Sequence, residues 1–327
     1  MAEIVFGMAV PHSGILGKDP DTWPEDRARD MSNKREMWYR CRPWKFEELA
    51  HERRNEGFEA VTTPEERRKR YNKCRAALDK MRQAYEDAKV DVAIILGKDQ
   101  QEMFMEFSPA LAIYTGKEIH NGPPGRSVYS PDKPMTHDGH PELALHLIQS
   151  LQNAGFDLMD LFKWMPNTWL QNRPIVPHAY GFVMHQIMSD NPPPCVPVLV
   201  NTFYPPTQPS MRRCIEFGKA LTAAIRSWDS NKRVAVIASG GLTHFVCDEA
   251  QDKVFLELLK NNDFEGLANV DERIYQSGTS EVKLYVPVLL AMQGTGAPMT
   301  LVDYVPTYRS EAGTGEGMAF MYWATGR

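Results

Sequence analysis

The sequence predicts an α/β fold, in which helices cover both faces of a central, mainly parallel or mixed β-sheet. Apolar runs of strand length alternate along the chain with longer segments whose apolar residues recur at helical spacing. One run, Val90–Gly97, is apolar apart from Asp91, as expected of a strand buried on both faces of a parallel sheet. The 327 residues are 43% hydrophobic and 24% charged, a globular composition that supplies a sizeable core.

The first predicted element is a strand over Ile4–Ala9, which runs into a loop that contains His12. Residues 19–61 are rich in aromatic and charged side chains but have no sustained period, and we interpret them as an elaborated insertion. From Pro64 to Ala88 apolar residues recur at three- and four-residue steps, and Thr63 is placed to cap the helix that this spacing predicts.

The same alternation continues to the end of the chain. In order, we expect a helix over Pro141–Ala154, a strand over Val196–Val200, a helix over Pro209–Trp228, a strand over Arg233–Ser239, helices over Glu249–Asn261 and Glu281–Met292, and strands over Met299–Val305 and Met318–Ala324. Pro287 should kink or break the last helix, because proline lacks an N–H and its ring clashes with the preceding turn. The chain has no internal repeat and no low-complexity linker, so we expect a single domain over residues 1–327.

Charge and cysteine content narrow the class of function. The net charge of -5, from 37 basic and 42 acidic residues, provides no general attraction to nucleic acid or to a membrane surface, so a small-molecule substrate is expected. Five scattered cysteines without a CxxC pair are typical of reduced intracellular thiols. No stretch approaches the roughly 18–20 apolar residues of a membrane span, and the N-terminus lacks a signal-peptide pattern, so a cytoplasmic location is expected.

Polar residues that follow the predicted strands are the candidates for chemistry, because ligands of α/β sheets bind beyond the carboxyl ends of the strands. They are His12, Asp99-Gln100, His244 and, at the start of a late helix, Glu281. Two histidines and a carboxylate from separate strand ends would suit a facial Fe(II) site. The alternatives are structural: His12 bonds to backbone in its loop, and Glu281 complements the positive end of a helix.

Short motifs in the same order along the chain give these residues a more specific interpretation. They are the N-terminal strand with His12, DVAIILGKDQ, GHPELALHLIQSL, NTFYPPTQPSMRRC, ASGGLTHF and SGTSEVK. Together they resemble the LigB-type class III (type II) extradiol ring-cleavage dioxygenases, the family of protocatechuate 4,5-dioxygenase β subunits and of gallate and methylgallate dioxygenases. The resemblance implies a LigB-like fold and breakdown of a catecholic or phenolic aromatic acid by O2.

The resemblance also implies roles for individual residues. The family holds non-haem Fe(II) with two histidines and a glutamate; His12 and Glu281 match two of these ligands, and Gln100 stands where the second histidine is expected. His244 matches the acid/base, and His178 resembles a further catalytic histidine near the substrate. Thr243 and Tyr180, which neighbour these histidines, are expected to bind substrate with His178.

The glutamine leaves three interpretations open. An amide oxygen is a poorer Fe(II) ligand than imidazole, so His12, Gln100 and Glu281 would hold iron firmly only when a catecholate completes the shell. Alternatively, the chain no longer binds iron, or His51 from the insertion replaces the missing ligand.

If iron is retained, the expected function is Fe(II)-dependent extradiol cleavage of an aromatic acid by O2, with His244 moving a proton. The first alternative is a metal-independent or differently metallated lyase or hydrolase that acts on a phenolic substrate in the same pocket. The second is a non-catalytic partner subunit, although a scaffold needs none of His12, His244 and Glu281. The expected partners are the aromatic substrate and O2, and assembly into a homo-oligomer stays open.

Overall fold

The computed structural model describes residues 1–32 and 37–326. Within these ranges, nine strands form one sheet in the order β11-β13-β1-β10-β4-β9-β5-β8, and β12 pairs with β13. The centre of the sheet is parallel and consists of β1 (Glu3–Val10), β10 (Arg233–Ser239), β4 (Val92–Gly97) and β9 (Cys195–Val200). The predicted α/β class with a mixed sheet is therefore confirmed.

Antiparallel pairings flank the parallel centre. β13 runs antiparallel to β1 and to its other neighbours, and β5 runs antiparallel to β9 but parallel to β8. The flanking strands are β11 (His244–Val246), β12 (Met299–Tyr308), β13 (Thr314–Ala324), β5 (Leu111–Tyr114) and β8 (Met159–Leu161). Two small hairpin sheets pair β2 (Met37–Tyr39) with β3 (Arg42–Trp44), and β6 (Glu118–Asn121) with β7 (Met135–Asp138).

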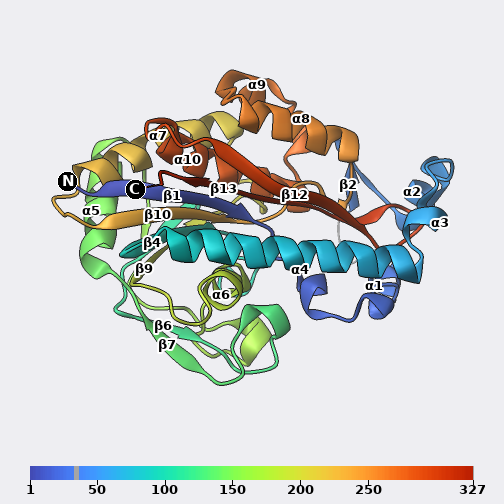
Figure 1. Ribbon diagram of the computed structural model, residues 1–327, viewed down its shortest axis with the longest axis horizontal. Coiled ribbons are helices and arrows are strands. Elements are labelled where there is room, and N and C mark those ends of the chain that lie inside the picture. Colours follow the sequence, from blue (N-terminus) through green and yellow to red (C-terminus); the bar gives the residue numbers. More distant parts are fainter. Residues whose placement is uncertain (33–36, 327) are drawn as a thin grey trace.

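Helices cover both faces of the main sheet (Figure 1). One apolar core lies between the sheet and the helices α5 (Pro141–Asn153), α7 (Met211–Ser227), α8 (Glu249–Lys260), α9 (Phe264–Asn269) and α10 (Val282–Gln293). A second core lies on the opposite face, under α4 (Pro64–Asp87) and α6 (His178–Phe182). The central strands of the sheet are thus buried on both faces.

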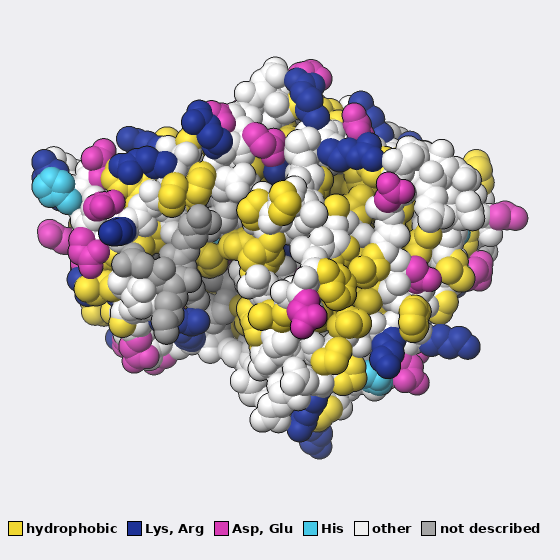
Figure 2. Space-filling view, turned by 180° about the vertical axis from the view of Figure 1, so that it is seen from behind, with side chains coloured by type: hydrophobic (Ala, Val, Ile, Leu, Met, Phe, Trp, Pro, Cys, Tyr) yellow, Lys and Arg dark blue, Asp and Glu magenta, His cyan; other side chains and the backbone are white. Residues whose placement is uncertain are grey.

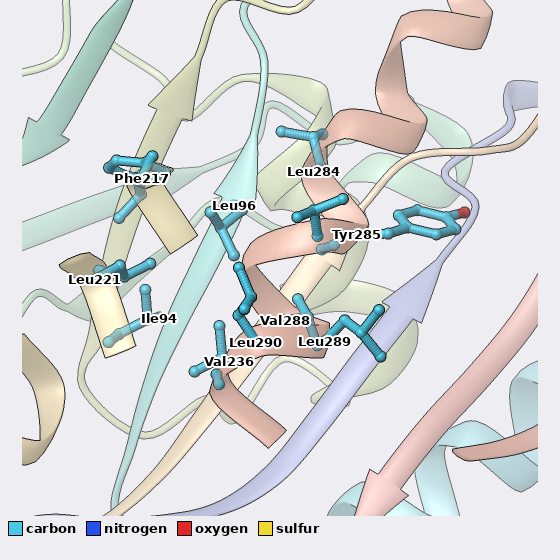
Figure 3. Packing of buried hydrophobic residues seen from close by; sticks show 14 of the residues in the cluster. Ile94, Leu96, Phe217, Leu221, Val236, Leu284, Tyr285, Val288, Leu289 and Leu290 are labelled. Atoms are coloured by element: carbon cyan, nitrogen blue, oxygen red, sulfur yellow. The ribbon is translucent and has the colours of Figure 1, made fainter. Parts of the chain in front are cut away.

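Strand β4 shows why the central strands are apolar without alternation. Ile94 and Leu96 belong to the first core, whereas Ala93 and Ile95 belong to the second, because successive side chains of a strand point to opposite faces. Figure 3 shows Ile94 and Leu96 among residues of α7 and α10, with Val288 and Leu290 close by.

Helix α4 forms as its sequence predicts. Pro64 occupies the first turn, and the Thr63 side chain accepts a hydrogen bond from the backbone N–H of Glu66, which is the expected cap. Cys74, Leu78 and the other apolar residues of one face are buried against the sheet. The prediction of an amphipathic helix is confirmed.

Helix α10 is not broken at Pro287, so that part of the expectation is wrong. Every residue from Val282 to Met292 is buried, and tertiary packing therefore opposes the local cost of the proline. Gly218 of α7 makes the close contact feasible, since a Cβ at this position would lie 2.8 Å from the Pro287 Cα.

The predicted insertion folds against the β12–β13 hairpin. It contains α1 (Glu25–Met31), β2, β3, α2 (Phe46–Glu52) and α3 (Phe58–Val61), whereas residues 33–36 lie outside the described part of the chain. Asp30 accepts hydrogen bonds from the Arg309 guanidinium at 2.8 and 2.9 Å and from the Thr314 hydroxyl at 2.7 Å. This buried ion pair joins the insertion to the end of the sheet.

The surface is mixed in charge. Figure 2 shows hydrophobic side chains in the middle of one face and charged side chains of both signs toward its rim, so this face offers an anionic polymer no continuous basic surface. In the described residues, the helices are all too short or too polar to cross a lipid bilayer.

Candidate functional site

Three of the predicted site residues, His12, His244 and Glu281, meet beyond the carboxyl ends of the central parallel strands. His12 follows β1, Lys98 follows β4, and Gly240 follows β10. His244 begins β11, and Glu281 ends a 3-10 turn that leads into α10. Five separate segments therefore converge on one point at the edge of the sheet, as the topology of an α/β fold requires.

The Glu281 carboxylate lies at the centre of this cluster and is 1% exposed. Its Oε1 atom is 2.7 Å from the Lys98 ammonium and 3.4 Å from His12 Nε2. Its Oε2 atom accepts a hydrogen bond from the Gly241 backbone N–H at 2.7 Å and lies 3.4 Å from His244 Nε2. The expectation that His12 and Glu281 lie side by side agrees with this geometry, which also adds an unpredicted lysine.

The orientation of the His12 ring follows from its neighbours. Ser239 Oγ donates a hydrogen bond to the Ala179 carbonyl at 2.7 Å, so its proton is already used. His12 Nδ1, 3.0 Å from Ser239 Oγ, therefore carries the hydrogen and donates it to Ser239. The other ring nitrogen, Nε2, therefore faces Glu281.

One hydrogen bond to the backbone fixes the orientation of the His244 ring. Its Nδ1 lies 2.8 Å from the Leu242 carbonyl and donates to it, which leaves Nε2 directed at Glu281. Burial alone would lower the pKa of His244, but the adjacent Glu281 carboxylate outweighs burial and raises it. For Glu281 burial acts in the other direction and would raise the pKa, but Lys98, His12 and His244 together hold this pKa well below its usual range.

Two glycines let these groups approach one another. A Cβ at Gly240 would lie 2.7 Å from the Glu281 Cβ, and a Cβ at Gly278 would lie 2.0 Å from the His244 ring. Gly240 therefore allows close approach to Glu281, and Gly278, in the SGTSE segment, allows close approach to His244.

The Gly278→Ala variant should displace the His244 ring, because the new methyl group and the ring cannot occupy the same space. We expect a loss of about 1–3 kcal/mol in the free energy of unfolding, the usual cost of overpacking a tight site. We also expect a change in the ring's proton resonances. Urea denaturation and histidine-selective NMR measure both effects, and unchanged His244 resonances would contradict the assigned contact.

A second buried cluster adjoins the first. Glu102, 0% exposed, accepts hydrogen bonds from the His178 backbone N–H at 3.0 Å, from His178 Nδ1 at 2.5 Å and from Asn167 Nδ2 at 3.1 Å. Arg126 Nη2 lies 3.6 Å from the same carboxylate. Burial would raise the pKa of Glu102, but His178 and Arg126 lower it. Glu102 therefore acts as an anionic anchor for the wall of the site.

His178 lies beside the first cluster, as predicted. Its ring centroid is 4.7 Å from that of His12, in an edge-to-face arrangement, and 5.5 Å from that of Trp169, on which it stacks. Burial outweighs the effect of Glu102 and lowers the pKa of His178, so the neutral ring is favoured. With Nδ1 bound to Glu102, Nε2 is the atom left for a ligand.

The loop after β4 differs from the expectation. Lys98 makes the contact with Glu281, while Asp99 accepts hydrogen bonds from the backbone N–H groups of Glu102, Met103 and Phe104. Among the described residues, the polar contacts of Glu281 come from His12, Lys98, Gly241 and His244, and half-buried Gln100 is not one of them. His51 is exposed on α2, away from this cluster, so the structure gives no support to its role as a replacement ligand.

Two expected substrate-binding residues have partners inside the protein. The Tyr180 hydroxyl donates to the Val198 carbonyl at 3.1 Å, and the side chain is 1% exposed. Thr243 Oγ1 donates to Asp252 at 2.9 Å and accepts from the Asp248 backbone N–H at 2.8 Å. These contacts position the sheet and the His244 loop.

Sequence reasoning missed Lys98, Ser239 and Glu102. Each stands within or next to a quoted motif, so strand-end position was an available signal for Lys98 and Ser239. Lysine, however, is almost never buried unless it is paired, and a sequence does not show the pairing. Glu102 lies four residues after Lys98 in the loop, where no pattern distinguishes it from an exposed glutamate.

The donor set does not fit the Fe(II) site that the family resemblance implies. Of two histidines and a carboxylate, His12 and Glu281 are in place, but Gln100 replaces the other histidine in the sequence and the Lys98 ammonium approaches the carboxylate in space. An ammonium is a cation without a lone pair and cannot be a ligand. In the described part of the chain, no group of three His, Cys, Asp or Glu side chains is arranged to hold a metal ion.

Comparison with known proteins identifies the family to which the fold belongs. Residues 58–309 match the family described as the catalytic LigB subunit of aromatic ring-opening dioxygenase. The chain is also 32% identical over 134 residues to a gallate dioxygenase of Pseudomonas putida, a stretch that covers 38% of this chain and 36% of that enzyme. The chain thus spans about a third of the length of this curated relative. Since the family match covers most of the sequence, the chain belongs to the LigB family of catalytic subunits of aromatic ring-opening dioxygenases.

Proposed function

We propose that the protein is an enzyme that binds a hydroxylated aromatic acid next to Glu281 and transfers a proton to or from it through His244. The observation that carries this proposal is the fixed orientation of His244, whose Nδ1 is bound to the Leu242 carbonyl and whose Nε2 faces the cluster. The family match and the similarity to a gallate dioxygenase support an aromatic substrate.

His244 and His178 differ in the direction in which their pKa values are shifted, and they are therefore suited to different roles. The raised pKa of His244 favours the imidazolium beside the Glu281 carboxylate, so Nε2 holds a proton that it can give to a substrate oxygen or carbon and later recover. Neutral His178, oriented by Glu102, presents Nε2 on the neighbouring wall and is suited to accept a hydrogen bond from a phenolic hydroxyl. Burial of the cluster strengthens both interactions by excluding water.

Two reactions are candidates. The first is oxygen-independent bond cleavage in a phenolic acid, of the lyase or hydrolase type. In a lyase reaction the bond between the ring carbon and the carboxylate breaks, CO2 leaves, and His244 gives its proton to the ring carbon. The contact between Lys98 and Glu281 favours this candidate because it neutralises the carboxylate without a metal. The second is ring opening by O2 with Fe(II), which the family match favours and which would need the metal to bring the ring and O2 together. The geometry of the donor set supports the first candidate better.

The two candidate reactions differ in whether they require O2 and a metal ion, and one experiment tests both requirements. Purified protein is incubated with catechol, protocatechuate and gallate, in air and without O2, with Fe(II) or with EDTA, and products are identified by mass spectrometry while O2 is recorded with an electrode. We expect conversion of protocatechuate and gallate that persists with EDTA and without O2, whereas catechol, which has no carboxylate to lose, should stay unchanged under these conditions. Uptake of one O2 per substrate that depends on Fe(II) would establish ring opening instead, and the absence of both binding and conversion would refute the enzyme proposal.

A further inference from the structure

Lys98 is the feature that the family resemblance does not explain. Its side chain is fully buried, its Nζ lies 2.7 Å from Glu281 Oε1, and the Phe203 ring lies below it at 4.3 Å. A buried lysine requires a counter-charge, and an aromatic face adds attraction for the ammonium. The position of this cation is therefore defined by two groups from distant parts of the chain, Glu281 and Phe203.

The cation lies on the carboxylate oxygen that also faces His12. His12 Nδ1 is bound to Ser239, and its Nε2 lies 3.4 Å from Glu281 Oε1. A carboxylate buried at this point requires a positive group beside it. In this chain the Lys98 ammonium is that group.

A divalent metal would compete with Lys98 for the same oxygen. A metal held by His12 and Glu281 has to lie near Oε1, where it would meet the ammonium at close range, and like charges in a buried site repel strongly. The loop that carries Lys98 also provides Gln100 instead of a histidine ligand. The missing histidine ligand at Gln100 and the added positive charge at Lys98 thus lie within three consecutive residues, and both act against metal binding.

The ammonium also retains capacity for a ligand. Although Lys98 Nζ and Glu281 Oε1 are only 2.7 Å apart, within the described residues neither atom has a partner at good hydrogen-bond geometry. Buried polar atoms normally have such partners. The unused N–H groups of Lys98 are suited to an anionic oxygen, such as a phenolate or carboxylate oxygen of an aromatic acid.

We infer that the Lys98 ammonium replaces the metal ion of this site and binds an anionic oxygen of the substrate. The inference deepens the proposed function, on which it rests for the identity of the ligand. Metal binding tests the replacement without reference to any substrate, so failure of the proposed function and failure of the replacement can be distinguished.

The metal experiment compares the parent protein with Gln100→His, Lys98→Ala and the double variant that carries both changes. Each protein is stripped with EDTA, dialysed anaerobically against Fe(II) or Co(II), and analysed for bound metal and for Co(II) absorption. We expect no stoichiometric metal in the parent or in Gln100→His, and at least about 100-fold tighter binding in the double variant, from removal of a unit charge beside a dication. Lys283→Ala is the matched control, because Lys283 is an equally buried lysine whose ammonium pairs with Glu272.

Variants that fold poorly still give a result, since metal that binds the folded state raises the melting temperature. A rise on adding Co(II) is expected for the double variant and not for the parent. One equivalent of metal in the parent that is lost in Glu281→Gln would overturn the replacement, and so would a double variant that binds no more metal than the parent.

The ligand experiment measures binding of protocatechuate and gallate in EDTA by calorimetry. Lys98→Met keeps the length of the side chain without its charge, and we expect it to weaken binding at least about 10-fold, the loss of one charged hydrogen bond. Binding to the parent in EDTA that is unchanged by Lys98→Met would refute the role of the ammonium. Binding that requires added metal would refute it as well.

Discussion

Replacing His244 with phenylalanine should lower the turnover number of the enzyme by about 100-fold or more, the range that a positioned acid/base contributes. The ring of the replacement fills the same buried space but carries no proton, so the binding constant for the aromatic ligand should change much less. The measurement is single-turnover conversion of the substrate identified by the product screen, together with calorimetric binding of the same compound.

Two further variants control this result. His244→Gln retains a hydrogen-bonding side chain that does not titrate, and it should be as slow as His244→Phe if proton transfer is the function of the ring. His120→Phe alters a histidine in β6 whose side chain is 45% exposed, and it should keep the parent rate. A His244→Phe protein that turns over at the parent rate would exclude His244 as the acid/base.

The second large effect concerns stability. Glu281→Leu removes the counter-charge of Lys98 and leaves an ammonium buried without a partner, so we expect the free energy of unfolding to fall by about 3–5 kcal/mol. Adding Lys98→Met should recover most of this loss, because replacing both buried charges with apolar groups of similar size is often neutral. Urea denaturation of the parent, both single variants and the double variant gives the coupling energy between the two residues.

An exposed ion pair provides the matched comparison. Glu265 pairs with Arg212 on the surface, where the two side chains are 74% and 57% exposed, and Glu265→Leu should change stability little. If the effects of Glu281→Leu and Lys98→Met simply add, the two groups do not interact in solution and the buried pair described here does not form.

The sequence predicts the central strands and long helices well because each is long and strongly patterned. β10 and α4 begin where their patterns begin, and His12, His244 and Glu281 were recognised because each stands next to such an element. The remainder depends on contacts between distant residues.

Three features show this limit. The short strand β5 pairs with β9, and β8 in turn pairs with β5, and no local pattern reveals these pairings. Pro287 remains within a helix because α7 and the sheet pack around it. The Lys98 contact depends on Glu281, a residue far along the chain, and on a ring from another loop.

The position of β1 has a consequence for how the protein is made. This strand precedes both of its neighbours, β10 and β13, by a long way in the chain, and His12 reaches its partner Ser239 across 227 residues of sequence. Such non-local pairing is slow to form, and β1 keeps an open edge until both β10 and β13 have been synthesised. A fragment cut to the family match at residues 58–309 would lack both this central strand and His12, so neither the sheet nor the site could be assembled from it.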